Sequence, residues 1–314
     1  MIRAMGFAVL ALCAAAARAD VAMAWSGATG TIVVAHDGRI EGFDRAGEKR
    51  LWSADGIASP SSIVTSLDGA SVAILDGFDD RIAVVSVADG VVALHDTPGT
   101  PVAAAFFERD LWVVLRDVSK VRRIAANGDA IDLGVALDPA LIAVSDQFVY
   151  VYSRAGGLLQ EIDPRLAQAR RIAPVGTGGS DLEIRLPKDE KADLIAHLCR
   201  PANGVIVRID LRLMESREMS NSGTPTDLAF VPWGAKLSID PGTSIIADPE
   251  KQTYDRVAIS AAGVFAFDSN SGTVYRVEGR SAAKIATGQT ATSFAATDDA
   301  LFTWDAKSAR PLKK

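Results

Sequence analysis

The stretch Ser71–Gly90, SVAILDGFDDRIAVVSVADG, contains the unit that decides the fold. Two short apolar runs, Val72–Leu75 and Ile82–Val87, flank a segment rich in aspartate and glycine. β-Branched residues suit the half-buried surface of a sheet, and aspartate and glycine tolerate the backbone angles of a tight turn. The stretch therefore predicts a β-hairpin, and Asp89-Gly90 predicts a second turn at its end.

Sets of four short apolar runs recur along the chain, joined by turns of Gly, Asp, Asn or Pro. One four-stranded sheet cannot bury both of its apolar faces, whereas neighbouring sheets stacked in a ring cover them. The sequence therefore predicts an all-β protein, a single β-propeller domain over residues 20–314. We prefer seven four-stranded blades to six or eight. The sets start about 40 residues apart, which is the spacing of propeller blades, at Pro60, Pro101, Pro139, Asp181 and Pro225.

The repeat is interrupted towards its carboxyl-terminal end. Leu228–Val231 begins a sixth set, with Phe265–Phe267 as one of its middle strands. We interpret the segment between them, Pro232–Val257, as an insertion into the propeller. The alternative is that Ser244–Ala247 belongs to an extra, degenerate blade. The last set is short, so we expect Val21–Trp25 to supply a strand that closes the ring.

The four-strand sets and the Asp/Gly turns, such as Leu75–Gly77 and Phe267–Gly272, resemble those of exported bacterial β-propellers of the WD40-like and YVTN-type superfamily. Trp304-Asp305 is similar to the Trp-Asp ending of WD40 repeats, although the literal Tyr-Val-Thr-Asn signature is absent. The resemblance implies a propeller that binds its ligands on one face. Some members of the superfamily are chains of quinoprotein amine dehydrogenases, but a shared fold does not transfer activity.

The first 19 residues have the composition of a secretory signal peptide. Arg3 supplies a charged start, an apolar stretch follows, and Ala17-Arg18-Ala19 is a cleavage site of the small-x-small type before Asp20. The apolar stretch is shorter than the roughly 20 residues that a membrane-spanning helix needs, and no later segment is long and apolar enough. We therefore expect a periplasmic or secreted protein without a transmembrane anchor.

Charge and cysteine content argue against several classes of partner and cofactor. The chain has a net charge of −6 and no long basic run, so nucleic acid is not an expected partner. Cys13 lies in the predicted signal peptide, which leaves Cys199 alone in the mature chain. A single cysteine cannot form an intramolecular disulfide, a doubly linked haem or a cysteine zinc site. We expect a buried Cys199 and no cofactor.

The sequence contains no strong catalytic or metal-binding motif. The aspartates Asp76, Asp79 and Asp80 are close enough to share a calcium ion, but Phe78 occupies the third position of an EF-hand loop. We expect a solvated turn there instead. The three histidines fall in different repeats, so we expect no zinc site and no other metal. They are His36, His95 and His197.

One face of the predicted propeller should carry an unusual distribution of charge. The loops that join second strands to third strands lie on one face, and the residue at or just past each second strand is charged. Three consecutive blades contribute arginine, which binds carboxylate and phosphate well, and the other four contribute aspartate. The alternative is that these side chains stay in water and satisfy turns. The seven candidate binding residues are Asp37, Asp76, Arg116, Arg154, Arg200, Asp268 and Asp305.

The sequence therefore predicts a non-catalytic periplasmic propeller that acts as a binding or scaffold module for a partner protein or a small anionic ligand. The alternative is a periplasmic enzyme, either a lactonase-like hydrolase or one chain of a quinoprotein dehydrogenase. No catalytic residue can be named from the sequence in either case. A tightly bound divalent ion in the purified protein would favour the enzyme.

We predict that the exported protein begins at Asp20, because Ala17-Arg18-Ala19 matches the specificity of signal peptidase for small residues. The measurement is the intact mass of the protein recovered from the periplasm. A mature chain that retains Met1, or one that carries a diacylglyceryl group on Cys13, would contradict this prediction.

Overall fold

The computed structural model describes residues 21–185, 189, 193–221, 223–231, 237, 239–251, 254–278 and 281–314. These residues form β-strands and turns, together with one 3₁₀ turn, η1 (Pro201–Asn203). The predicted signal peptide, residues 1–19, lies outside the described residues, as does part of the predicted insertion. In the described parts of the chain no helix is long and apolar enough to cross a membrane.

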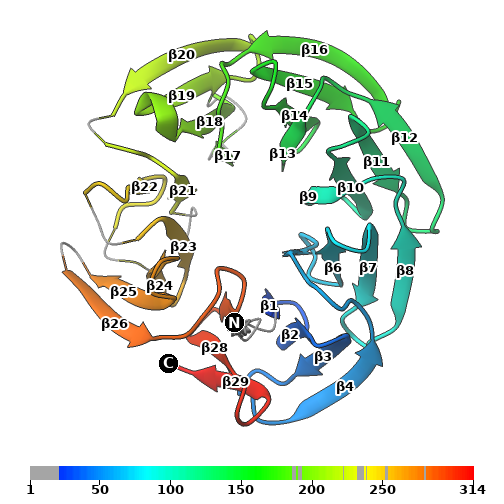
Figure 1. Ribbon diagram of the computed structural model, residues 1–314, viewed down its shortest axis with the longest axis vertical. Helices are drawn as coiled ribbons and strands as arrows, with labels where there is room; N and C mark the ends of the chain where they lie inside the picture. Colours follow the sequence, from blue (N-terminus) through cyan, green and yellow to red (C-terminus); the bar gives the residue numbers. More distant parts are fainter. Residues whose placement is uncertain are drawn as a thin grey trace, which may run out of the picture.

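Seven antiparallel sheets of three or four strands surround a common axis (Figure 1), which confirms the predicted β-propeller. Blades 1 to 3 contain β1 (Val21–Ser26), β2 (Thr31–His36), β3 (Arg39–Phe43), β4 (Arg50–Asp55), β5 (Ser62–Thr65), β6 (Ser71–Asp76), β7 (Arg81–Ser86), β8 (Val92–Asp96), β9 (Pro101–Phe107), β10 (Asp110–Leu115), β11 (Lys120–Ile124) and β12 (Ala130–Gly134). Blades 4 and 5 contain β13 (Pro139–Val144), β14 (Val149–Ser153), β15 (Leu158–Asp163), β16 (Gln168–Pro174), β17 (Asp181–Arg185), β18 (Ile195–Arg200), β19 (Val205–Asp210) and β20 (Glu215–Ser220). Blades 6 and 7 contain β23 (Arg256–Ser260), β24 (Gly263–Asp268), β25 (Thr273–Glu278), β26 (Ser281–Ala286), β27 (Phe294–Ala296), β28 (Leu301–Asp305) and β29 (Arg310–Lys313).

A two-stranded sheet lies between blades 5 and 6, and we call it the small sheet. Its strands are β21 (Asp227–Phe230) and β22 (Ser244–Ala247). β21 packs against β17 and β23, which are the first strands of blades 5 and 6 and lie nearest to the axis of the ring (Figure 1). The small sheet therefore occupies an additional position in the ring. The prediction that Leu228–Val231 shares a sheet with Phe265–Phe267 was wrong, because β21 pairs with β22 whereas β24 takes β23 as its inner partner. Ser244–Ala247, which the alternative interpretation assigned to an extra, degenerate blade, forms the second strand of this sheet.

The ring closes where β1 meets β27. The backbone N–H of Met23 donates to the Thr292 carbonyl at 2.8 Å, and the Thr292 hydroxyl donates to the Val21 carbonyl at 2.6 Å. Beneath these bonds, side chains of blade 1 share an apolar cluster with Ala295 and Phe302. β1 therefore closes the ring through these hydrogen bonds and this packing, and it remains the first strand of blade 1 instead of joining the last sheet.

Apolar contact between neighbouring sheets forms the core. Trp52 on the outer strand of blade 1 illustrates it, because its indole N–H donates to the Val87 carbonyl of blade 2 at 2.9 Å. A Cβ atom on Gly42 would lie 2.2 Å from this ring, and one on Gly90 would lie 2.6 Å from it. Both glycines are thus required by the close approach of the tryptophan. The thiol of Cys199 is buried, as expected. It lies in another such contact, between blade 5 and the small sheet.

Substitution of Val149 by Asp should destabilise the fold severely, by about 3 kcal/mol or more, because it buries an unpaired charge. Val149 is fully buried in the cluster between blades 3 and 4. Val84→Asp should be less harmful, since Val84 is half-buried, and Val91→Asp is the control because Val91 is 63% exposed. Urea unfolding of the three variants measures the order. Equal midpoints for Val149→Asp and Val91→Asp would contradict the described packing.

Candidate functional site

The seven residues predicted from the sequence lie at or just past the ends of second strands, on the face that carries the links between blades. The backbone shows this arrangement in neighbouring blades, where Arg116 N–H donates to the Thr100 carbonyl and Arg154 N–H donates to the Asp138 carbonyl. Thr100 and Asp138 belong to links between blades. We call this surface the loop face. Ion pairs between any two of the seven residues are absent, so the structure does not join them into one site.

Arg200 contributes no free charge to the loop face. Its side chain is only 10% exposed and forms an ion pair with Glu218. The remaining donors are also used, because Nε donates to the Thr177 carbonyl at 2.9 Å and Nη2 donates to Asn203 Oδ1 at 3.2 Å. A Cβ atom on Gly176 would lie 2.5 Å from the guanidinium carbon. Arg200 therefore holds together the loops at the edge of blade 5.

Arg116 and Arg154 are the arginines that the loop face presents to solvent. Arg116 is exposed, and its Nε lies 3.9 Å from Asp138 Oδ1. Arg154 is half-buried, and its backbone bonds to the same link residue. Of the three arginines predicted on consecutive blades, two are therefore accessible on the loop face, with the carboxylate of Asp138 beside them.

The aspartates of the loop face mainly satisfy their own turns. Asp76 is buried, and its carboxylate accepts hydrogen bonds from the N–H groups of Phe78 and Ser59. In Asp268, the Ser271 hydroxyl is the main cause that lowers the carboxyl pKa, and in Asp305 the Ser308 hydroxyl does the same. Asp37 lies beside the buried His36, with Oδ2 at 3.3 Å from Nδ1.

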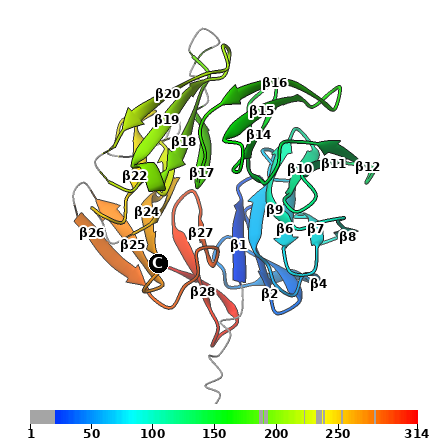
Figure 2. The ribbon, with the colours of Figure 1, turned by 45° about the horizontal axis from the view of Figure 1, so that its top comes forward.

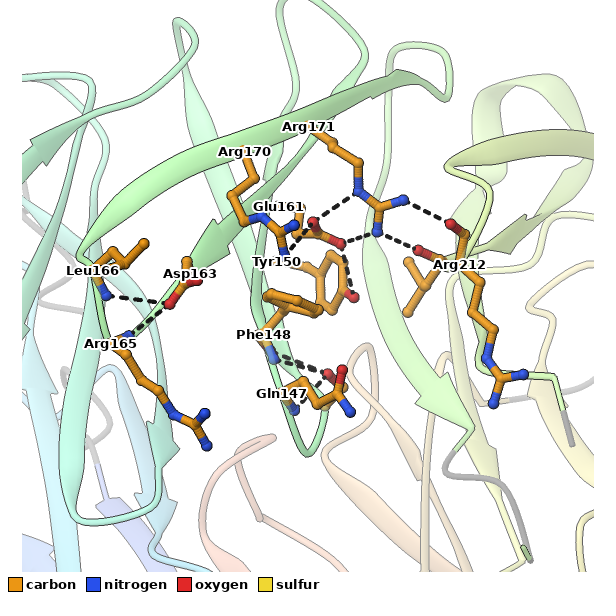
Figure 3. Close-up of polar contacts among 12 residues, drawn as sticks. Gln147, Phe148, Tyr150, Glu161, Asp163, Arg165, Leu166, Arg170, Arg171 and Arg212 are labelled. Atoms are coloured by element: carbon orange, nitrogen blue, oxygen red, sulfur yellow. Dashed lines mark hydrogen bonds and ion pairs between the residues drawn. The ribbon is translucent and has the colours of Figure 1, made fainter. Parts of the chain in front are cut away.

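The opposite face carries a groove of about 580 Å³ between blades 4 and 5, which we call the 4–5 groove. Phe148 and Tyr150 of blade 4 and Leu194 and Leu211 of blade 5 supply its apolar lining. Arg171 of β16 crosses the groove towards blade 5 (Figure 3). In the tilted view, the outer strands β16 and β20 of the two blades lie side by side (Figure 2). The groove therefore lies at a seam between blades.

A buried ion pair fixes one wall of the 4–5 groove. Glu161 is fully buried on β15, and Arg171 donates to both of its carboxylate oxygens, with Nε at 2.8 Å from Oε1. The same guanidinium donates to the carbonyls of Arg212, at 2.6 Å, and Leu211, at 2.9 Å. Burial, followed by the charge of Glu161, raises the pKa of the Tyr150 hydroxyl, which remains protonated. Arg171 therefore connects a buried carboxylate of blade 4 to a turn of blade 5.

The turn that Arg171 contacts has a counterpart on blade 4. Asp163 Oδ1 accepts hydrogen bonds from the N–H groups of Arg165 and Leu166, at 2.9 and 3.2 Å. In blade 5, Asp210 Oδ1 accepts them from Arg212 and Leu213, at 2.9 and 3.0 Å. Two neighbouring blades therefore present the same Asp-x-Arg-Leu turn. We call these the twin turns, and the repeated sequence signal that reveals them was missed in the sequence analysis.

Both leucines of the twin turns point away from the core. Leu166 is 70% exposed and Leu213 is 65% exposed. The Arg165 side chain extends into solvent (Figure 3) and forms no hydrogen bond or ion pair with the described residues. An exposed leucine beside an arginine is presented twice on one face, with the 4–5 groove between the blades that carry them.

Three carboxylates gather at the inner strands of blade 5 and the small sheet. Asp181 accepts a hydrogen bond from the Leu228 N–H at 3.1 Å, and Asp227 accepts one from the Val257 N–H at 2.8 Å. Burial, and then the neighbouring carboxylate charges, raise the pKa of Asp181, and burial raises that of Asp227. The Glu183 side chain is accessible to solvent. The surrounding protein nevertheless removes part of its hydration, and this desolvation, followed by the charge of Asp227, raises its pKa to about 7. These carboxyl groups therefore keep their protons to a higher pH than ordinary carboxyl groups do.

The inner carboxylates do not form a metal centre in the described parts of the chain, where no group of three or more His, Cys, Asp or Glu side chains is arranged to hold an ion. His197, opposite Glu183 in the sheet, has a pKa lowered to about 4 by burial and then by Arg208 and Arg185. It therefore stays neutral. The arrangement joins inner strands through carboxyl-to-backbone hydrogen bonds.

Asp181→Asn should flatten the pH dependence of stability above pH 4. The folded-state pKa of Asp181 is raised above its ordinary value of 3.8, so its contribution is fully present below that value and is lost as the pH rises through the folded pKa. Each unit of pKa difference corresponds to about 1.4 kcal/mol of unfolding free energy. Asparagine keeps an oxygen for the Leu228 N–H. Urea unfolding between about pH 5 and 8 measures the difference.

Asp268→Asn is the control with the opposite sign. The pKa of Asp268 is lowered by its turn, so its contribution is present above the ordinary pKa and is lost as the pH falls through the folded one. Asp268→Asn should therefore reduce the loss of unfolding free energy at acid pH. A wild-type protein that does not lose stability relative to Asp181→Asn as the pH rises would contradict the raised pKa.

No family model matches the sequence, and no curated protein matches it significantly. Solved structures do match the fold. BamB from Moraxella catarrhalis has a TM-score of 0.60 at 12% identity, over 93% of this chain and 95% of that chain. Virginiamycin B lyase from Staphylococcus aureus has a TM-score of 0.58 at 13% identity, over 94% of each chain. The dihydro-heme d1 dehydrogenase NirN has a TM-score of 0.56 at 14% identity, over 94% of this chain and 67% of that chain. At these identities the similarity demonstrates the β-propeller fold alone.

Proposed function

We propose that this chain is a non-catalytic periplasmic binding or scaffold module of the exported propeller type, and that it holds a partner protein on the twin turns and the 4–5 groove. The periplasmic location rests on the signal-like sequence of residues 1–19. The observation that carries the function is the repeated exposure of an Arg-Leu pair on two neighbouring blades. The 4–5 groove, with the apolar side chains Phe148, Leu194 and Leu211 in its lining, lies between these two blades.

The chemistry of this surface defines the partner. Leu166 and Leu213 offer two apolar contacts, and binding them would remove both side chains from water. Arg165 has a guanidinium group without a protein partner in the described residues, and such a group pairs well with carboxylate. The partner should therefore present an apolar strip with carboxylates at its border. Phe148 lies under the Arg170 guanidinium, 4.9 Å away, and provides a further aromatic contact at the groove.

The rigidity of the surface also supports a binding role. Arg171 holds the blade 5 turn by its Arg212 and Leu211 carbonyls, and each turn is bonded to its own aspartate. A surface that is ordered before its partner arrives loses less conformational entropy on binding. The twin turns therefore suit a docking site better than a mobile loop would.

The solved structures of similar fold serve both function classes. They include BBS1N in complex with ARL6DN and a mitotic checkpoint complex, and they also include a streptogramin B lyase. The enzyme alternative, a lactonase-like hydrolase or a quinoprotein dehydrogenase chain, has one feature in its favour. That feature is the group of raised carboxyl pKa values at Asp181, Glu183 and Asp227, since perturbed values cluster at functional sites. Their bonds to backbone N–H groups of neighbouring strands favour a structural role.

The loop face is a second candidate surface for an anionic ligand or acidic partner. Only Arg116 and Arg154 of the predicted arginines face solvent, and Asp138 reduces their net charge. The double variant Arg116→Ala/Arg154→Ala therefore tests this surface separately from the twin turns. Arg200→Ala is unsuitable, because it would leave buried acceptors unpaired.

The Leu166→Ser/Leu213→Ser variant should lose its partner while it keeps its fold, because both side chains are exposed. Quantitative pull-down from periplasmic extract identifies proteins captured by the wild type and lost by this variant, and titration with the purified partner then measures the affinity. We expect a loss of about tenfold or more, as for truncated contact residues at the centre of an interface. Leu67→Ser is the matched control, since Leu67 is 95% exposed on blade 2.

Three outcomes separate the candidates. Loss of a partner by the leucine variant alone supports the twin turns. Loss by Arg116→Ala/Arg154→Ala alone transfers the function to the loop face. If both variants and Leu67→Ser capture the same proteins as the wild type, then neither surface is a protein-docking site and the proposal is wrong.

A further inference from the structure

A second groove, of about 430 Å³, lies between blades 2 and 3, and we call it the 2–3 groove. The β5–β6, β9–β10 and β11–β12 loops form its mouth, and strands β7 and β8 contribute to its wall. These two blades are adjacent in the ring (Figure 1). The groove falls within the volume range of small-molecule sites, which is about 300 to 1,000 Å³. The contact between blades 3 and 4 separates it from the 4–5 groove, and the two grooves share no lining residue.

The floor of the 2–3 groove is apolar. Phe106, Leu111 and Ile124 of blade 3 are buried there, and Val84 and Ala93 of blade 2 complete the lining. Such a floor favours the transfer of hydrocarbon from water. The body of a ligand in this groove should therefore be a hydrocarbon chain or ring.

Arg109 places a cation at the mouth of the groove, near the carboxylate of Asp68, on which its charge acts. It lines the groove, is exposed, and forms no hydrogen bond or ion pair with the described residues. Its neighbour Asp68 already has donors, because its Oδ1 accepts from the Ser66 hydroxyl at 2.7 Å and from the Ala70 N–H at 3.0 Å. Asp68 Oδ1 is thus occupied, and the Arg109 guanidinium group keeps its own donors for a ligand.

His95 adds a second unused polar group to the wall. Neither ring nitrogen has a hydrogen-bond partner in the described residues, and burial, followed by the charge of Arg122, lowers the pKa of the ring. Arg122 itself is bound to Asp132 and to the Asp96 carbonyl, so it does not compete for a ligand. A neutral imidazole offers one N–H donor. Arg109 and His95 together favour a ligand that accepts hydrogen bonds and carries a negative charge.

We propose that the 2–3 groove binds a small monocarboxylate with an apolar body, whose carboxylate pairs with Arg109 and whose hydrocarbon portion covers Phe106 and Leu111. A guanidinium group matches the geometry of a carboxylate with two parallel donors. The site is distinct from the twin turns, so it extends the proposed function without depending on it.

Calorimetric titration with three eight-carbon probes tests the site. Octanoate supplies the carboxylate, octan-1-ol supplies the same chain without charge, and octylammonium reverses the charge. We expect octanoate to bind the wild type with a dissociation constant below about 1 mM and the other probes to bind at least about tenfold more weakly. Arg109→Ala should weaken octanoate binding by about tenfold or more, towards the value for octan-1-ol.

Two further variants make the experiment specific. Ala93→Phe should fill the groove and abolish binding, since Ala93 lines it and is exposed. Arg39→Ala removes an exposed arginine of blade 1 and should leave octanoate binding unchanged. Thermal unfolding confirms that each variant is folded. Equal affinity for octanoate and octan-1-ol, equal octanoate affinity in Arg109→Ala and wild type, or no binding at about 10 mM octanoate would each overturn the proposal.

Discussion

The structure depends on one constraint, which is that each sheet has two apolar faces and buries both only against its neighbours. Strands β2, β6, β10 and β14 are buried along almost their whole length, whereas the outer strands β4, β8 and β12 are mostly exposed. Stability is therefore shared among the seams between sheets, and the seam between β1 and β27 completes the ring. Because the sheet faces are occupied, functional groups are left to the loops, the outer edges and the grooves where two sheets diverge.

The buried pair of Glu161 and Arg171 shows how a polar group can serve this architecture. Removing a carboxylate from water is costly, and an ion pair repays it only when the remaining hydrogen bonds are satisfied. Here the guanidinium group bonds to both carboxylate oxygens and to two carbonyls of the next blade. The pair therefore contributes less as a source of net stability than as a means of fixing the blade 5 turn relative to blade 4. That fixed relation sets the position of the turn with the exposed Leu213 relative to the blade that carries the exposed Leu166.

The features that the sequence predicts correctly are those with local causes. Strand pairs and Asp/Gly turns such as Ser71–Gly90 depend on neighbouring residues, and the repeat of about 40 residues extends them to a ring. The small sheet escapes such a prediction because β21 and β22 pair across a long connection. The same distinction applies to the loop face. Asp268 bonds within its own turn, as the alternative interpretation held, whereas Arg200 is bound by Glu218 and Thr177, whose proximity arises only from the folded blade.

The two grooves differ because the fourth strands that border them differ. At the 4–5 groove, β16 carries Arg171, whose guanidinium group is paired with Glu161 and bonded to blade 5. The exposed side chains near this groove are therefore those of the twin turns, which suit a large partner. At the 2–3 groove, β8 carries Ala93 and the uncharged His95, so the seam remains open and apolar, with Arg109 at its mouth. A repeated scaffold thus gives equivalent seams separate chemistry through single side chains. Since distant sites without shared partners act independently, changes at one seam should leave the other unaltered.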